Sequence, residues 1–252
     1  MHGRWLSNAA ALFFVLAALP ARADEVRVLA AGAVQTAVRQ LAAAFATETG
    51  HTLRPEFDTV GALRNRMLAG ERIDVVILSE AGMATLEQAA RIDTKSTIGL
   101  GSTAVALAVR KGAAVPDLSS PEALRRSLLA AASIAHADPA RGATAGAHFA
   151  GVLERLGIAA EIRARVTVLP FGGDVIKAVA EGRFEIGVSQ SSEIVAHADV
   201  VLAGRLPAPF DHRTRYVAAK GVGAVPGADA FLAMLQSSSG RVALMEIGFA
   251  EP

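Results

Sequence analysis

The sequence predicts an α/β protein of two lobes, each built on a mostly parallel sheet flanked by helices. Short β-branched and apolar runs alternate along the chain with Ala- and Leu-rich stretches whose apolar residues recur at helical spacing. The 252 residues have the length of one large domain or two small ones, and 52% of them are apolar, which is enough to build a buried core. The chain has no cysteine, which excludes disulfide bridges, cysteine nucleophiles and zinc sites built on cysteine.

The charge pattern argues against a nucleic-acid partner. The chain has 25 Lys and Arg residues against 24 Asp and Glu residues, and the basic residues form no cluster. A nucleic-acid-binding protein needs a basic face that displaces counterions from the phosphates. We therefore expect a small molecule, and not DNA or RNA, as the ligand.

The first 23 residues have the features of an export signal. Arg4 precedes an apolar run over residues 6–19, which is shorter than the roughly 20 residues of a membrane span. Ala21 and Ala23 form the small-x-small pattern that signal peptidases accept, so we expect cleavage before Asp24 and a periplasmic location. The remaining 229 residues carry 23 basic and 24 acidic side chains. The alternative is an uncleaved membrane anchor, in which this cleavage pattern would have no purpose.

The first part of the exported chain predicts three strand–helix units. The expected strands and helices alternate over residues 26–30, 34–47, 52–57, 61–68, 74–78 and 81–90. The strand at 74–78 is apolar along its length, as a strand buried on both faces is. Gly50 is expected to end the first helix as its C-cap.

The second part predicts a similar lobe. Its expected elements are strands at 104–109, 133–136, 166–169 and 185–189, and helices at 121–131, 145–156 and 174–180. Ser119 or Ser120 is the expected N-cap of the helix at 121–131. The last segment predicts a strand at 216–219 and two helices, which is too little for a third domain. We therefore expect a first lobe of residues 24–102 plus 212–252 and a second lobe of residues 103–211, with one sheet in each.

Small and hydroxyl residues follow the expected strands directly before the helices. These segments are residues 31–33, 58–61, 79–80, 142–146, 171–173 and 190–192. Helix N-termini present unpaired N–H groups and partial positive charge, and open α/β sheets bind ligands at the carboxyl ends of their strands. The pattern predicts an anion site made mostly of neutral donors in the cleft, although any one segment alone could be a capped loop.

The expected ligand contacts come from these segments. We expect backbone N–H groups near Ala33, Thr59, Gly172 and Ser191 to bind the anion. The other expected contacts are Val60, Ser79, Arg141, Thr144, His148, Gly173, Gln190 and Ser192. The histidines are dispersed and no Gly-x-Ser-x-Gly motif is present, so neither a metal site, a cofactor nor a serine hydrolase is expected.

Four titratable side chains have two interpretations each. His148 lies in the first turn of an expected helix, where an imidazole can donate to a carboxylate or accept a proton, or can be an ordinary surface histidine. Arg141 can form a bidentate pair with a carboxylate or can be a solvated loop residue. Glu193 and Asp58 can act as bases, or can be favourable acidic partners of helix N-termini.

Three segments resemble the opening of a known family. Residues 29–33 read LAAGA, residues 57–63 read FDTVGAL and residues 74–79 read DVVILS. These segments resemble the periplasmic molybdate-binding proteins, a branch of the type II solute-binding proteins of ABC transporters, and the resemblance extends over essentially the whole exported chain. It implies the two-lobed type II fold closing on a small anion, a monomer, and the membrane permease of an ABC transporter as partner.

Two loops depart from that family and change the expected ligand. Family members that hold molybdate offer serine hydroxyls where this chain has Gly32-Ala33 and Thr59-Val60. Residues 142–148 and 188–193 are more similar to a neighbouring branch that includes aconitate isomerase, a periplasmic enzyme. This similarity implies an organic di- or tricarboxylate in place of molybdate or tungstate.

We therefore expect a receptor of an ABC-type uptake system. The alternative is an isomerase on the same scaffold, which interconverts cis- and trans-aconitate by an allylic proton shift. His148, Glu193 or Asp58 would then be the catalytic residue.

Overall fold

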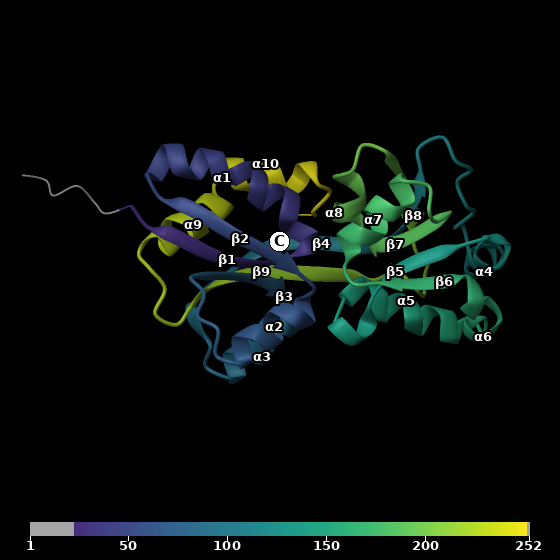
Figure 1. The fold of residues 1–252 in the computed structure, drawn as a ribbon, viewed down its shortest axis with the longest axis horizontal. Helices are drawn as coiled ribbons and strands as arrows, with labels where there is room; N and C mark the ends of the chain where they lie inside the picture. The colour runs from purple at the N-terminus through teal and green to yellow at the C-terminus, as the bar shows by residue number, and fades with distance from the viewer. Residues whose placement is uncertain (1–22, 251–252) are drawn as a thin grey trace, which may run out of the picture.

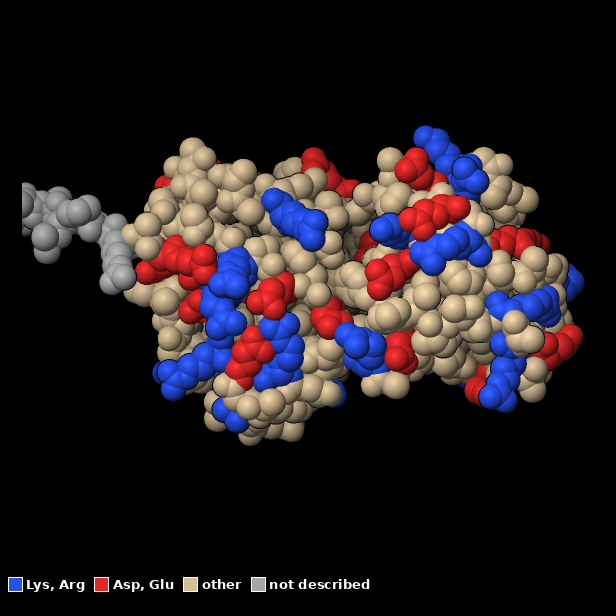
Figure 2. Space-filling model, viewed as in Figure 1, with Lys and Arg blue, Asp and Glu red and all other residues tan. Residues whose placement is uncertain are grey.

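The computed structural model describes residues 23–250, which form two lobes arranged along the long axis of the molecule (Figure 1). The predicted export signal, apart from its last residue, lies outside the described residues. Within residues 23–250, no helix combines the length and the apolar character that a membrane span needs. Acidic and basic side chains are interspersed over the face shown in Figure 2, so neither sign of charge dominates it.

The first lobe is a sheet between two helical layers. Strand β1 (Glu25–Ala31) pairs in parallel with β2 (Thr52–Asp58) on one side and β3 (Val75–Ser79) on the other. Strand β9 (Arg213–Gly221) continues the sheet as the antiparallel neighbour of β3. All five residues of β3 are buried, as the continuous apolar run predicts.

Helices cover both faces of this sheet (Figure 1). One face carries α1 (Gln35–Thr49), α9 (Gly227–Gln236) and α10 (Ser238–Glu246). The other face carries α2 (Val60–Leu68) and α3 (Glu80–Gln88). The rings of Phe45 and Phe231 meet edge to face with centroids 5.5 Å apart, which fixes α9 of the C-terminal segment against α1 of the N-terminal part.

The second lobe repeats the plan with different strands. Strand β5 (Ile134–Ala137) pairs in parallel with β6 (Val166–Leu169) and β7 (Ile186–Gln190). Helices α7 (Gly172–Ala180) and α8 (Ser191–Val195) lie on one face. The other elements are α4 (Pro121–Ala130), α5 (Thr144–Arg155) and α6 (Ala159–Ile162), with the 3-10 turns η2 (Pro139–Arg141) and η3 (Arg163–Arg165). A further 3-10 turn, η1 (Gly32–Val34), belongs to the first lobe, where it joins β1 to α1. Of the two expected caps, Ser120 is the one that accepts a hydrogen bond from Ala123 N at the start of α4.

The long strand β4 (Ile92–Arg110) joins the two lobes. Its first part pairs with β9, and its second part pairs with β7 and with β8 (Val200–Arg205), always antiparallel. The strand order is therefore one path, β2-β1-β3-β9-β4-β7-β5-β6, and the two expected sheets share β4. We expected a strand only at 104–109, because residues 92–103 of β4 are mostly polar residues and glycine and do not form an apolar run.

Separate apolar cores support the two lobes. One cluster contains Phe45, Leu78 and Phe231 and draws its residues from both ends of the described chain. The second lobe has a cluster on each face of its sheet, with Phe149 in one and Ile176 in the other. The lobe boundaries given above remain our proposal.

Candidate functional site

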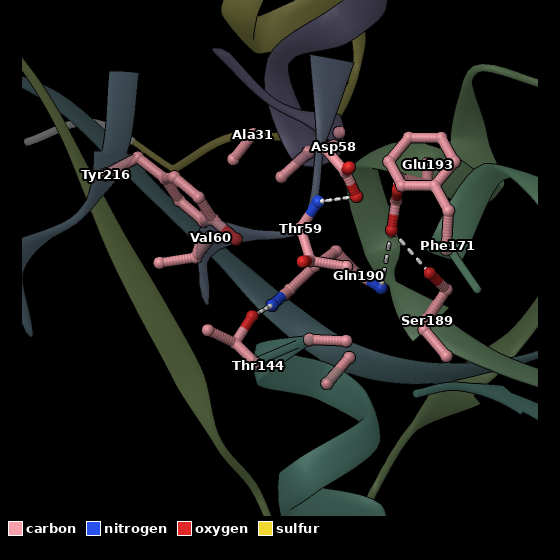
Figure 3. Close-up of a pocket in the computed structure, with 16 residues that line it drawn as sticks. Ala31, Asp58, Thr59, Val60, Thr144, Phe171, Ser189, Gln190, Glu193 and Tyr216 are labelled. Atoms are coloured by element: carbon pink, nitrogen blue, oxygen red, sulfur yellow. Dashed lines mark hydrogen bonds between the residues drawn. The ribbon is translucent and has the colours of Figure 1, made fainter. Parts of the chain in front are cut away.

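A cavity lies between the lobes, where the carboxyl ends of strands meet the starts of helices (Figure 3). Sixteen residues line it: Ala31, Gly32, Ala33, Asp58, Thr59, Val60, Ala137, Ala143, Thr144, Ala145, Phe171, Gly172, Ser189, Gln190, Glu193 and Tyr216. The space between their atoms measures about 320 Å³, with the part open to solvent included. Residues of both lobes line the cavity, so its size depends on how far apart the lobes lie.

Two helices begin at the cavity without a side-chain cap. The N-cap residues of α5 and α7 are Ala143 and Phe171, and neither makes a side-chain capping hydrogen bond. The first residues of these helices, Thr144 and Gly172, line the cavity. Their N–H groups and the helix dipoles favour an anionic group there. By contrast, α2 is capped by Thr59, whose hydroxyl accepts a hydrogen bond from Ala62 N at 3.2 Å.

The floor of the cavity consists of Thr144, Ser189, Gln190, Glu193 and Tyr216. Gln190 is 3% exposed, and its Nε2 donates to the hydroxyls of Thr144 at 2.8 Å and Thr214 at 3.2 Å. Its Oε1 is buried and has no hydrogen-bond partner among the described residues. Burial raises the pKa of the Tyr216 hydroxyl, so this floor residue is neutral.

Glu193 is the acidic residue of the floor. Its Oε2 accepts a hydrogen bond from the Ser189 hydroxyl and a longer one, 3.4 Å, from Gln190 N. Burial raises the pKa of the Glu193 carboxyl, while these two hydrogen bonds act in the opposite direction. No Lys, Arg or His is present among the described residues that line the cavity. The carboxyl is therefore suited to carry or exchange a proton.

The rim of the cavity consists of Asp58, Thr59 and Gly61 from the first lobe and Arg141 and Gly142 from the second. Arg141 Nη2 forms hydrogen bonds of 2.9 and 2.8 Å with the two Asp58 carboxylate oxygens, and this contact raises the pKa of Arg141. Thr59 Oγ1 donates to the Arg141 carbonyl at 2.5 Å, and Gly61 N donates to the Gly142 carbonyl at 3.2 Å. The rim therefore joins the two lobes through side chains and backbone at once.

Eight of the predicted site residues line the cavity. They are Ala33, Asp58, Thr59, Val60, Thr144, Gly172, Gln190 and Glu193. Gly173 and Ser192 line a neighbouring groove that shares Glu193 with the cavity. Ser192 Oγ is buried and has no hydrogen-bond partner among the described residues.

Four predicted residues have other contacts. Ser79 caps α3 by accepting from Gly82 N at 3.2 Å, and Ser191 Oγ lies 2.7 Å from Thr103 Oγ1. Arg141 belongs to the rim. His148 Nε2 lies 2.7 Å from the Phe210 carbonyl, and its ring stacks on His212 with centroids 4.5 Å apart. None of these four is among the residues that line the cavity.

Sequence analysis missed two polar residues of the floor. Ser189 belongs to the run 188–193, but it lies inside β7 and before the turn on which the prediction concentrated. Tyr216 comes from β9, 23 residues beyond Glu193, the nearest lining residue along the chain, and no loop motif marks it. The part of the chain that the structure describes has no group of three or more His, Asp or Glu residues placed to hold a metal ion.

The chain is similar to an isomerase in sequence and to anion-binding proteins in structure. An aconitate isomerase from Pseudomonas sp. is 29% identical over 195 residues, which are 75% of this chain and 72% of that protein. The periplasmic molybdate-binding protein of Azotobacter vinelandii superposes with a TM-score of 0.74 at 20% identity, covering 90% of this chain and 100% of the other. The sulfate-binding protein of Mycobacterium tuberculosis H37Rv superposes with a TM-score of 0.67 at 16% identity, covering 90% and 86%.

The structural likenesses confirm the predicted fold, that of the two-lobed periplasmic binding proteins. The sequence profile of the family described as "Bacterial extracellular solute-binding protein" matches residues 26–250, nearly the whole of the described chain. This chain therefore belongs to the bacterial extracellular solute-binding proteins.

Proposed function

We propose that this protein is a periplasmic receptor that binds a small organic di- or tricarboxylate and delivers it to the permease of an ABC transporter. The observation that carries the proposal is the cavity between the lobes, at which α5 and α7 begin without side-chain caps. Membership of the solute-binding family supports a binding role and export from the cytoplasm. A receptor needs only a difference in affinity between its open and closed forms, and the rim contacts supply a closed form.

The hydroxyl groups near the cavity favour a carboxylate over a tetrahedral oxyanion. Thr59 Oγ1 donates to the Arg141 carbonyl, and the Ser189 hydroxyl donates to Glu193. These donors are therefore already used inside the protein, and a compact dianion would find few hydroxyl donors to replace its water. A longer di- or tricarboxylate can instead place one carboxylate group at the start of α5 and a second carboxylate group at the start of α7.

A thermal-shift screen tests this proposal. The probes are tricarballylate, citrate and trans-aconitate on one side, and molybdate, tungstate and sulfate on the other. A ligand at 100 times its dissociation constant stabilises the folded state by about 2.7 kcal/mol, so a raised Tm is expected with the carboxylates. Stabilisation by molybdate and tungstate alone would contradict the proposed ligand class.

The export and assembly parts of the proposal are tested on the native protein. We expect a monomer in the periplasmic fraction whose N-terminal residue is Asp24. Intact mass and light scattering measure both properties. A mass that includes Met1 would contradict cleavage, and a stable dimer would contradict the monomer.

A second candidate function is isomerisation of aconitate. The similarity to the Pseudomonas enzyme and the position of Glu193 in the cavity favour it. An allylic shift needs a base that removes a proton from carbon and an acid that returns one, and a carboxyl of raised pKa suits both steps. Asp58 is paired with Arg141, and His148 contacts Phe210, so Glu193 is the strongest of the three predicted catalytic candidates.

The two functions are separated by incubating the purified protein with cis-aconitate and following trans-aconitate by NMR. Turnover by the wild type that disappears in Glu193→Gln, while that variant still binds trans-aconitate, would establish the enzyme. Binding without turnover would establish the receptor.

A further inference from the structure

The two oxygens of the Glu193 carboxylate have different surroundings. Oε2 accepts both hydrogen bonds, from the Ser189 hydroxyl and from Gln190 N. Oε1 has no hydrogen bond from any residue in the range 23–250, and it lies between Gly32 of the opposite lobe and Gly172 of its own lobe, so closely that a Cβ at either glycine would be 2.6 Å away. One oxygen is therefore held by the protein, and the other lies between the lobes, beside the cavity.

The charges around Glu193 provide no cation to balance it. Among the described residues that line the cavity, the acidic side chains are Asp58 and Glu193, and Asp58 is paired with Arg141. Tyr216 from β9 is neutral. His197 and Glu193 both line the neighbouring groove, but His197 is not among the residues that line the cavity. An anion that enters the cavity therefore meets a carboxyl without a basic partner, and two buried negative charges repel each other strongly.

We propose that Glu193 determines specificity by sharing one proton with the ligand: the site accepts organic acids, whose carboxylates are basic enough to share a proton with Oε1, and disfavours sulfate, which is a much weaker base. This inference rests on the proposed function of the cavity as an organic-anion site. A hydrogen-bonded carboxylic acid–carboxylate pair replaces the repulsion of two carboxylates with one short bond. Sulfate is too weak a base to share that proton, so for sulfate most of the repulsion remains.

Binding of a fully ionised carboxylate then takes up one proton. The raised pKa of Glu193 in the free protein favours this uptake, because its acid form is already more accessible than that of an exposed glutamate. The affinity should rise as the pH falls, by up to about tenfold per pH unit while one proton is bound per ligand.

Calorimetric titration of the full exported chain with tricarballylate and with sulfate tests the proposal. Titrations between about pH 5.5 and 8, in two buffers of different ionisation enthalpy, count the protons taken up. The wild type should take up close to one proton with tricarballylate at pH 8 and should bind sulfate at least tenfold more weakly. In Glu193→Gln the uptake should disappear, and sulfate affinity should rise at least tenfold because an amide N–H replaces the repelling oxygen.

Two further variants serve as controls. Glu193→Asp keeps a carboxyl and should keep the proton uptake. If it does, the loss of uptake in Glu193→Gln comes from the missing carboxyl and not from damage to the site. His197→Gln removes the nearby histidine and should bind as the wild type does. The ionisation of tricarballylate itself is common to all variants, and it cancels in the comparison with Glu193→Gln.

The outcomes separate this inference from the proposed function. Tricarballylate binding with equal proton uptake in wild type and Glu193→Gln would overturn the role of Glu193 and leave the receptor function standing. Wild-type binding of sulfate at pH 8 as tightly as tricarballylate would also overturn that role. Binding of neither probe by the wild type would overturn the proposed function, and this inference with it.

Discussion

The rim and the floor of the cleft use charge in different ways. At the rim, Asp58 and Arg141 come from different lobes and neutralise each other, with 26% and 43% of their side chains exposed. At the floor, Gln190 is buried and Glu193 has no basic partner among the described residues. We infer from this comparison that paired charge holds the lobes together, whereas the unpaired carboxyl is available to a ligand. Substitutions that affect only the rim or only the floor can test this division.

The largest effect is expected from blocking the backbone contact at the rim. In Gly61→Ala, the new Cβ would lie 2.6 Å from the Arg141 carbonyl oxygen and 2.7 Å from Gly142 Cα. Both are backbone atoms, so the lobes must separate to relieve the clash. We expect ligand affinity to fall by roughly 10- to 100-fold, or about 1.4 to 2.7 kcal/mol, in calorimetric titrations.

Gly151→Ala is the matched control for that substitution. Gly151 also lies in a helix, and a Cβ there meets nothing within 4 Å. Its affinity should equal that of the wild type, and its stability should rise by about 0.5 to 1 kcal/mol. If Gly61→Ala bound as well as Gly151→Ala, the ligand-bound lobes would not meet at this contact.

The second effect concerns the floor. Gln190→Leu removes the amide that joins the hydroxyls of Thr144 and Thr214, and leaves both without this partner. We expect the free energy of unfolding to fall by about 1 to 2 kcal/mol in urea titrations, with weaker ligand binding in addition. Gln88→Leu, at the exposed end of α3, is the control and should change stability by less than about 0.5 kcal/mol. A Gln190→Leu protein as stable as this control would show that the floor network contributes nothing net.

The rim ion pair should have a smaller effect than either of these. Partly exposed pairs contribute about 0.2 to 1 kcal/mol, so Arg141→Met and Asp58→Asn should each speed ligand dissociation by up to roughly fivefold in stopped-flow measurements. The double variant should dissociate no faster than either single variant, and high salt should reduce the difference. Arg183→Met breaks an exposed 2.9 Å pair with Glu181 inside one lobe and should leave dissociation unchanged. Additive effects in the double variant would show that Asp58 and Arg141 act separately.

The sequence predicts the parts of the cleft that depend on local pattern. The alternation of strands and helices marks where each helix begins, and Thr59, Thr144 and Gly172 line the cavity at those positions. His148 shows the limit of this reasoning. It is four residues beyond Thr144, which moves it about 6 Å along the helix, and its ring meets the Phe210 carbonyl instead of the cavity.

Local sequence pattern does not predict which residues meet between the lobes. Asp58 and Arg141 are 83 residues apart, and each was predicted to act on a ligand, because nothing in either loop indicates the position of the other lobe. Tyr216 reaches the cavity only because β9 runs beside β3 and β4. Such pairings depend on how β4 and β9 carry the chain between the lobes, which strand and helix periodicity does not describe.

The smallest predicted effect is the change of folding stability with pH, to which two titratable groups of the second lobe contribute with opposite signs. His136 is 4% exposed, and its ring lies edge-on to Phe149 with centroids 5.6 Å apart. Burial lowers the pKa of His136, so the unfolded chain binds its proton more readily than the folded protein does. Its contribution to stability is complete above about pH 6.5 and is lost as the pH falls from there toward the lowered pKa. Glu193 acts in the opposite sense, because its raised pKa makes the folded protein bind a proton first.

His136→Gln separates the two contributions. From pH 7 to 5.5 the wild type should lose less than about 1 kcal/mol, or roughly 3 °C in Tm, because the gain from Glu193 offsets part of the loss from His136. The variant should start from a lower Tm, since it loses the contact with Phe149, but its Tm should then stay level or rise as the pH falls. His197→Gln, the control, should keep the wild-type slope. If the Tm of His136→Gln falls with pH as steeply as that of the wild type, a group other than His136 causes the acid sensitivity. If the Tm still rises in the double variant His136→Gln/Glu193→Gln, the carboxyl of Glu193 is not the group that gains a proton.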